Sequence, residues 1–205
     1  MNWYRITNIK KQMDKYQNKY RIPTNRLHDY DYGANGCYYV TICTKNREHY
    51  FGDVVIVETD NYPSLRKTEI GEIAEKYWLD IPNHFQFVIL DQFVIMPNHI
   101  HGILIFNKID VSWQPNKFGS QSQNLGSVIR GFKSSLKRYA NENNIDFAWQ
   151  SRFYDRIIRD QKGLDNVREY IFNNLQNWKN DEYNNVETDN YPSLHSVGVT
   201  PKIEI

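Results

Sequence analysis

Two histidines one residue apart open an apolar run in "MPNHIHGILIF", residues 96–106. Because successive side chains of a strand point to opposite faces, His99 and His101 share one face, about 7 Å apart along the chain. Two imidazoles on one face can bind one metal ion, whereas a single buried histidine is more often a hydrogen-bonded core residue. The pair therefore predicts a metal site only if the fold adds a third ligand and a reactive group.

A segment near the C-terminal end offers both groups. Tyr170 and Asn174 are four residues apart, so they are neighbours on one surface of a predicted helix, and Asn177 continues that surface. A tyrosine beside an apolar stripe is most often a packing residue with its hydroxyl at the rim. Beside a metal-bound histidine pair, the same tyrosine becomes a candidate nucleophile.

The elements that must position these residues follow from the periodicity of the apolar side chains. Period-two and β-branched segments predict strands at 37–44, 87–95, 99–106 and 148–160, and helical spacing predicts helices within 68–85, 124–144 and 164–178. The order β-α-β-β-α-β-α predicts an α+β fold. We expect a ferredoxin-like antiparallel sheet with helices packed on one face.

Length and composition predict one domain with additional segments at its two ends. We expect a basic N-terminal arm at 1–36, a catalytic domain at 37–180 and a flexible C-terminal tail at 181–205. The segment "VETDNYPSL" occurs at 57–65 and again at 186–194, and its turn-forming residues predict two exposed loop or tail insertions. No run of eighteen apolar residues and no signal peptide is present, which predicts a cytoplasmic protein without a membrane partner. Cys37 and Cys43 are expected to pack as small apolar groups.

The formal net charge of +1 conceals an uneven distribution of charge. Basic residues outnumber acidic ones 7 to 2 in residues 1–30 and 8 to 4 in residues 124–163, and acidic residues prevail 11 to 7 in residues 31–123. Such basic zones are most often solvated surface, and they are also typical of a protein that binds a phosphate backbone. Charge alone does not decide between the two interpretations.

Four motifs, in this order and spacing, carry a family resemblance. The segments "MPNHIHGILIF", "VIRGFKSSLKRY", "WQSRFYDRIIRD" and "VREYIFNN" resemble those of the single-tyrosine HUH transposases, in particular the REP-associated tyrosine transposases. The segments "YYVTICTKNREHYFG" and "WLDIPNHF" are similar to that group too, so the resemblance runs from about residue 21 to about residue 180.

The resemblance implies a metal-dependent endonuclease and strand transferase that acts on single-stranded DNA through a covalent 5′-phosphotyrosine. It implies that His99 and His101 bind Mg²⁺ or Mn²⁺, that Tyr170 is the nucleophile and that Asn174 is the third ligand. Asn173 is the alternative ligand if the helix is rotated. Leu175 stands where the family usually has proline, which affects the end of the helix more than the ligands. Zinc is a competing occupant of a two-histidine site.

The same resemblance implies DNA hairpins and single-stranded DNA as partners, and it favours a monomer over a homodimer. The residues expected to bind DNA are Arg130, Lys133, Lys137, Arg152, Arg156, Lys10, Lys11, Arg21 and Arg26, with Trp149 and Phe153 stacking on bases. Two other classes remain open: a domesticated hairpin-binding protein that does not cleave, and a ferredoxin-like structural or RNA-binding module.

Overall fold

The computed structural model describes residues 15–16, 19–20, 27, 30–57, 62–109, 122–181 and 183–184. The chain divides into two compact units, residues 1–30 and residues 31–205. Residues 31–36, which the sequence analysis assigns to the basic arm, are therefore part of the second unit. A hydrogen bond from Leu125 N to Tyr32 O, 2.9 Å long, ties this segment to it.

The first unit contains a short antiparallel ribbon. Its strands are β1 (Lys15–Tyr16) and β2 (Lys19–Tyr20), with Lys15 opposite Tyr20. The arm residues that were expected to bind DNA lie outside the described residues: Lys10, Lys11, Arg21 and Arg26.

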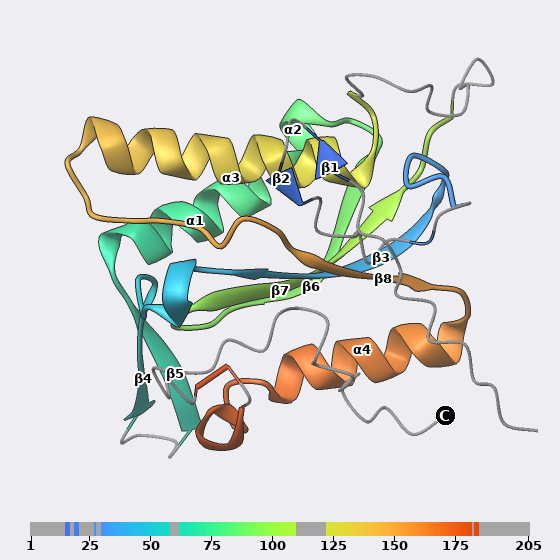
Figure 1. Ribbon diagram of the computed structural model, residues 1–205. Coiled ribbons are helices and arrows are strands. Elements are labelled where there is room, and N and C mark those ends of the chain that lie inside the picture. Colours follow the sequence, from blue (N-terminus) through green and yellow to red (C-terminus); the bar gives the residue numbers. More distant parts are fainter. Residues whose placement is uncertain are drawn as a thin grey trace, which may run out of the picture. The chain divides into compact units, whose positions relative to one another are not determined.

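A four-stranded antiparallel sheet is the centre of the second unit (Figure 1). Its strands are β3 (Gly36–Cys43), β6 (Val88–Ile95), β7 (His99–Phe106) and β8 (Tyr154–Ile158), in the spatial order β6-β7-β3-β8. Helix α1 (Glu69–Leu79) lies in sequence between β3 and β6, and helix α3 (Leu125–Glu142) between β7 and β8. This succession and strand order are those of a ferredoxin-like sheet, so the predicted α+β fold is confirmed.

Helices cover both faces of the sheet, not one. Figure 1 shows α1 and α3 on one side and α4 (Gln161–Asn173) on the other. The expectation of a single covered face is wrong because alternate residues of β3 are buried on both sides. Tyr38 and Val40 are fully buried on the α1 and α3 side, and Tyr39, 3% exposed, packs with residues of α4. A sheet with two apolar faces needs cover on both.

The core beneath α1 depends on a close approach of a helix to strand β7. The indole of Trp78 has no exposed surface and lies against Gly102, where no side chain intervenes. Its ring also meets Phe132 of α3 edge to face, with centroids 5.3 Å apart. One aromatic side chain therefore joins α1, α3 and the sheet.

A hairpin that the sequence analysis does not predict precedes α1. Strands β4 (Gly52–Val57) and β5 (Tyr62–Lys67) pair antiparallel, and the first copy of the duplicated segment, residues 57–65, ends β4 and begins β5. The expectation of a loop is therefore wrong for this copy. Its exposure agrees with the expectation, because Tyr62 is 43% exposed. The second copy lies outside the described residues.

Side-chain caps fix where the long helices begin. The Asn124 side chain accepts from Ser127 N at the start of α3, and the Asp160 side chain accepts from Gly163 N at the start of α4. Helix α4 therefore begins earlier than the predicted 164–178 and ends at Asn173, after which turns lead into the 3-10 helix η2 (Trp178–Asn180). The shorter elements are η1 (Lys45–Arg47) and α2 (Ile81–His84).

We predict that Gly102→Ala destabilises the protein. A Cβ at Gly102 would lie 2.2 Å from Trp78 Cζ2, inside a packed core, so the indole or the strand must shift. Overpacking of this kind costs about 1–3 kcal/mol in the free energy of unfolding, which urea titration measures. Gly131→Ala is the matched control, because its Cβ would meet only the ring edge of Phe85, at 3.3 Å. Equal stability of the parent and Gly102→Ala would contradict the packing described.

Candidate active site

Strand β7 brings the two histidines together on the face that α4 covers. His101 pairs with Thr41 and His99 with Cys43 in the antiparallel register of β7 with β3. The histidines are 1% and 0% exposed, and their Nε2 atoms lie 2.9 Å apart. The two imidazoles therefore converge on one point, as their spacing in the sequence predicts.

Burial keeps both imidazoles neutral. Loss of hydration lowers the pKa of His101 to about 3, and it lowers the pKa of His99, with further repulsion from His101. Two bare nitrogen lone pairs at this distance repel each other, so the pair needs either a hydrogen or a cation between the nitrogens. The site is therefore suited to hold a metal ion at neutral pH.

Helix α4 carries a tyrosine to the same point. The Tyr170 hydroxyl lies 3.4 Å from His101 Nε2, and the two ring centroids are 5.2 Å apart. The helix is held by Val167 and Ile171, which pack on Tyr39 and Ile103 of the sheet, while Tyr170 borders this cluster. The phenol thus stands at the edge of an apolar contact with its oxygen directed at the histidines.

An ion pair fixes the helix along the sheet. Arg168 donates from Nε to Asp91 Oδ1 at 2.9 Å and from Nη2 to Asp91 Oδ2 at 2.5 Å. Asp91 lies at an irregularity of β6, between Leu90 and Phe93. The bonds from Arg168 lower the pKa of the Asp91 carboxyl, so it stays ionised at neutral pH. A two-point contact of this kind restricts sliding of α4 on the strand.

Asn174 directly follows α4, one turn after Tyr170. Its side chain is buried, with 2% of its surface exposed, and its Oδ1 accepts no hydrogen bond from the described part of the chain. A buried amide oxygen without a partner is costly, and a cation is one way to satisfy it. Asn173, the alternative ligand, is only half-buried.

Asp181 is a residue of this site that sequence reasoning missed. One carboxylate oxygen of Asp181 and one ring nitrogen from each of His99 and His101 lie within 4.8 Å of one another. Its Oδ1 accepts a hydrogen bond of 2.7 Å from Tyr183 N. No spacing signal singles it out, because it stands beyond the last predicted helix, in what was expected to be the tail.

Polar side chains contact the outer nitrogen of each imidazole. His101 Nδ1 lies 2.7 Å from the Tyr39 hydroxyl and 2.9 Å from Thr41 Oγ1, and His99 Nδ1 lies 2.8 Å from Asn98 Oδ1. Burial raises the pKa of the Tyr39 phenol well above its usual value, so this hydroxyl keeps its proton. The period of two in strand β3 could have shown that Tyr39 and Thr41 share a face.

The donor set fits a divalent cation. Two neutral imidazoles, one carboxylate and one unpartnered amide oxygen combine nitrogen and oxygen ligands of the kind that Mn²⁺ accepts and Mg²⁺ tolerates. The carboxylate of Asp181 also offsets part of the cation's charge within a buried site. Which metal the protein uses stays a prediction.

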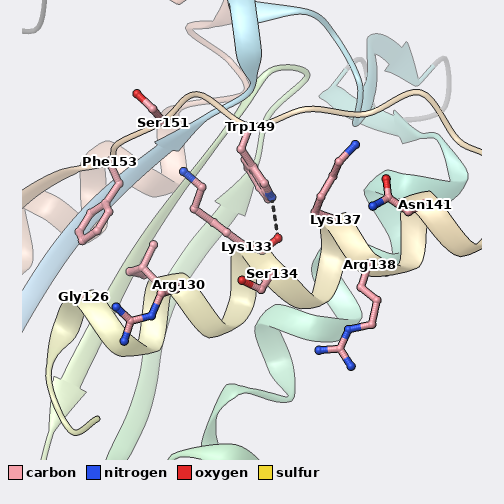
Figure 2. A pocket seen from close by; sticks show the side chains of 11 residues that line it. Gly126, Arg130, Lys133, Ser134, Lys137, Arg138, Asn141, Trp149, Ser151 and Phe153 are labelled. Carbon is pink, nitrogen blue, oxygen red and sulfur yellow. Dashed lines mark hydrogen bonds between the residues drawn. The ribbon is translucent and has the colours of Figure 1, made fainter. Parts of the chain in front are cut away.

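A basic groove of about 610 Å³ runs along α3 (Figure 2). Five residues that were expected to bind DNA line it: Arg130, Lys133, Lys137, Trp149 and Phe153. Arg138, which the sequence analysis did not select, lines it as well. Because α3 and α4 cover opposite faces of the sheet, the groove and the histidine pair lie on opposite sides of it.

The two lysines of the groove already bind backbone carbonyls. Lys133 Nζ donates to Gln150 O at 2.5 Å, and Lys137 Nζ donates to Phe147 O at 2.6 Å. Burial lowers the pKa of Lys133 to about 8. These ammonium groups hold the segment after α3 against the helix, so a bound phosphate would have to share them.

The remaining predicted DNA contacts divide between the two sides of the sheet. Trp149 donates from its indole nitrogen to Lys133 O, at 3.1 Å, and its ring lies 4.9 Å from that of Phe147, so it is half-buried packing. Arg156 pairs with Tyr39 in the sheet and therefore faces the α4 side. Arg152, whose carbonyl accepts from Lys133, lies beside the groove. The described residues that were expected to bind DNA therefore do not form a single surface.

No family model matches the chain. The chain is 36% identical over 169 residues to an uncharacterized protein of Haemophilus influenzae, covering 77% of this chain and 89% of that protein. This degree of identity and coverage shows that the chain belongs to the same family as the Haemophilus influenzae protein.

The chain is also similar to two solved structures. A REP-associated tyrosine transposase bound to a REP hairpin matches with a TM-score of 0.49 and 16% identity, over 75% of this chain and 72% of that one. A protein from Deinococcus radiodurans R1 that carries the name of a transposase matches with a TM-score of 0.34 and 14% identity, over 74% and 97%. Within the described residues, no helix has the length and hydropathy of a membrane span.

We predict that acid destabilises the metal-free protein through the histidine pair. In the unfolded chain a histidine has a pKa of about 6.5, whereas burial depresses both pKa values in the folded chain. The unfolded state therefore binds more protons below pH 6.5, and stability is lost as the pH falls. Between pH 7 and 5.5 the loss is about 1 kcal/mol for each buried histidine, measured by urea unfolding with a chelator present.

A parent protein whose stability does not change over this range would mean that the pair is not neutral when folded.

Proposed function

We propose that this chain is a metal-dependent endonuclease and strand transferase for single-stranded DNA, of the single-tyrosine HUH class. In this proposal Tyr170 is the nucleophile, His99 and His101 bind the metal, and Asn174 and Asp181 supply its oxygen ligands. The substrate class and the 5′-phosphotyrosine come from the resemblance in the motifs, since geometry alone does not specify them.

One observation carries the proposal. The Tyr170 hydroxyl lies 3.4 Å from His101 Nε2, which is itself 2.9 Å from His99 Nε2. Phosphodiester cleavage by a side chain needs a nucleophilic oxygen and positive charge that stabilises the phosphate, and a cation at this histidine pair would place the two side by side. A packing tyrosine would have no need of a hydroxyl at this point.

The reaction proceeds in two substitutions at phosphorus. Tyr170 Oη attacks, the Oη–P bond forms and the P–O3′ bond breaks, so one strand leaves with a 3′-hydroxyl and the other stays joined to Tyr170 through its 5′-phosphate. The phenol proton passes to solvent, and O3′ takes a proton as it leaves. In strand transfer a 3′-hydroxyl loses its proton and attacks the same phosphorus, the Oη–P bond breaks, and Tyr170 Oη takes up a proton.

A bound divalent cation supplies positive charge that polarises the phosphate and favours the phenolate. The residues of the chain do the remaining work. His101 sets the distance between the cation site and Tyr170, and the contact of α4 with Tyr39 and Ile103 keeps the phenol in place. Tyr39 is not a competing nucleophile, because burial raises the pKa of its hydroxyl and leaves it neutral.

The basic groove on α3 is proposed to hold the backbone of a DNA hairpin. Arg130, Lys133, Lys137 and Arg138 line it, which gives four cationic side chains along one helix. Phosphate contacts of this kind supply affinity without reading sequence. Hairpins of the REP type, a monomeric state and a cytoplasmic location are further parts of the proposal that rest on the resemblance and on the sequence.

We predict that Tyr170→Phe abolishes the covalent adduct between protein and DNA. The variant lacks only the attacking oxygen, so it should still bind a hairpin with a single-stranded flank. The parent, incubated with that DNA and Mn²⁺ or Mg²⁺, should give a denaturation-resistant complex whose mass places the DNA on Tyr170.

Tyr139→Phe is the matched control, since it removes a surface hydroxyl bonded to Glu69 and should retain full adduct formation. Cleavage by Tyr170→Phe at the rate of the parent would refute the assigned nucleophile. A parent that binds the hairpin but forms no adduct with either ion would instead be a non-cleaving hairpin-binding protein.

We predict that Asn174→Ala and Asp181→Ala each weaken Mn²⁺ binding by about 100-fold or more, because changes even outside the ligand shell cost about 10–100-fold. Isothermal titration calorimetry of the folded variants measures the affinity. Asn173→Ala is the control, as it removes the neighbouring amide and should bind Mn²⁺ like the parent. If Asn173→Ala loses affinity and Asn174→Ala does not, the ligand is Asn173.

A further inference from the structure

Asn98 is a buried asparagine in the turn between β6 and β7, directly before the histidine pair. It has no exposed surface. Its carbonyl oxygen accepts from both the backbone nitrogen and the hydroxyl of Thr44, each at 2.9 Å. These two bonds fix the backbone of the turn, and with it the position of the Asn98 Cα atom from which the side chain extends.

The orientation of the Asn98 carboxamide follows from its neighbours. The nitrogen Nδ2 lies 3.0 Å from Arg47 O and 2.7 Å from Tyr183 O. Backbone carbonyls only accept hydrogen bonds, so the donor end of the amide must face them. The oxygen Oδ1 then faces His99 Nδ1, at 2.8 Å.

This orientation determines the tautomer of His99. An amide oxygen only accepts, so the hydrogen of the bond must be on His99 Nδ1. The neutral ring then carries its lone pair on Nε2, the atom that lies 2.9 Å from His101 Nε2. His99 is thus prepared as a metal ligand before any metal arrives.

His101 has no such constraint. Its Nδ1 faces the hydroxyls of Tyr39 and Thr41, at 2.7 and 2.9 Å, and a hydroxyl can donate or accept. Without a cation, His101 Nε2–H can donate to the lone pair of His99. With a cation, the hydrogen moves to Nδ1 and a hydroxyl turns to accept it. The tautomer of His99 is therefore fixed, whereas that of His101 can change when a cation binds.

The Asn98 carboxamide also holds the segment that carries Asp181. The carbonyl that accepts from Nδ2 is that of Tyr183, and Tyr183 N donates to Asp181 Oδ1 at 2.7 Å. The ring of Tyr183 lies over His99, with centroids 4.6 Å apart. One amide therefore connects the imidazole ligand with the backbone next to the carboxylate.

We propose that Asn98 is a positioning residue that fixes His99 in the Nδ1–H tautomer and holds Tyr183, and through it Asp181, beside the cation site. The part of this inference that concerns metal affinity rests on the proposed function. The part that concerns the tautomer does not, because it applies to the protein without metal.

The first test is nitrogen-15 NMR of the histidine rings in the parent protein with a chelator present. We expect the shifts of His99 to be those of a ring protonated on Nδ1 and bare on Nε2, with His101 as the opposite tautomer. A His99 ring protonated on Nε2 in the parent would overturn the proposal, whatever any variant does.

The second test compares Asn98→Ala with Asn124→Ala. Both remove a buried asparagine, but the Asn124 side chain caps α3, where it accepts from Ser127 N. We expect Asn98→Ala to lose the single His99 tautomer and to bind Mn²⁺ about 10–100-fold more weakly by calorimetry, as for other partners of metal-bound histidines. Asn124→Ala should keep both properties of the parent.

The outcomes separate this proposal from the nuclease. Unchanged Mn²⁺ affinity and an unchanged tautomer in Asn98→Ala would refute the role of Asn98 even if the parent forms a DNA adduct. A parent that binds Mn²⁺ through the fixed His99 tautomer but never forms an adduct would refute the nuclease and leave Asn98 as proposed.

Discussion

The approach of two neutral imidazole nitrogens to 2.9 Å inside the protein is the contact on which the site depends. It exists because the antiparallel register of β7 with β3 sends His99 and His101 to the face that α4 covers. Both rings are buried, so their nitrogens must find their partners inside the protein. Asn98 and Tyr39 supply such partners for the outer nitrogens, at 2.8 and 2.7 Å.

The opposite face of the same strand keeps this register in place. Gly102 lies between the positions that face α4 and admits the indole of Trp78 from the other side. A slip of one residue would exchange the faces, so either His101 or Ile103 would meet Trp78 and both histidines would leave the face that α4 covers. The apolar core under α1 and α3 therefore protects the geometry of the polar site on the other face of the sheet.

The sheet also separates the basic groove from the histidine site, although both were expected to contact DNA. The basic groove lies along α3, and the histidine pair with Tyr170 lies under α4 (Figures 1 and 2). Helix α4 is held to the sheet by Val167 and Ile171 and by the bonds from Arg168 to Asp91. These contacts decide where the phenol points, and none of them involves a residue of the groove.

The sequence by itself determined which side chains of a single strand or helix share a face, because local periodicity encodes that. The period of two placed His99 and His101 on one face, and helical spacing placed Tyr170 and Asn174 on one surface. Only the tertiary structure decided that α4 covers the face opposite α3, that Arg156 lies apart from the groove and that Asp181 lies near the histidines. Periodicity reports which side chains of one element point the same way. Which element they meet is set by burial of apolar surface between segments distant in the chain, and no local pattern records that choice.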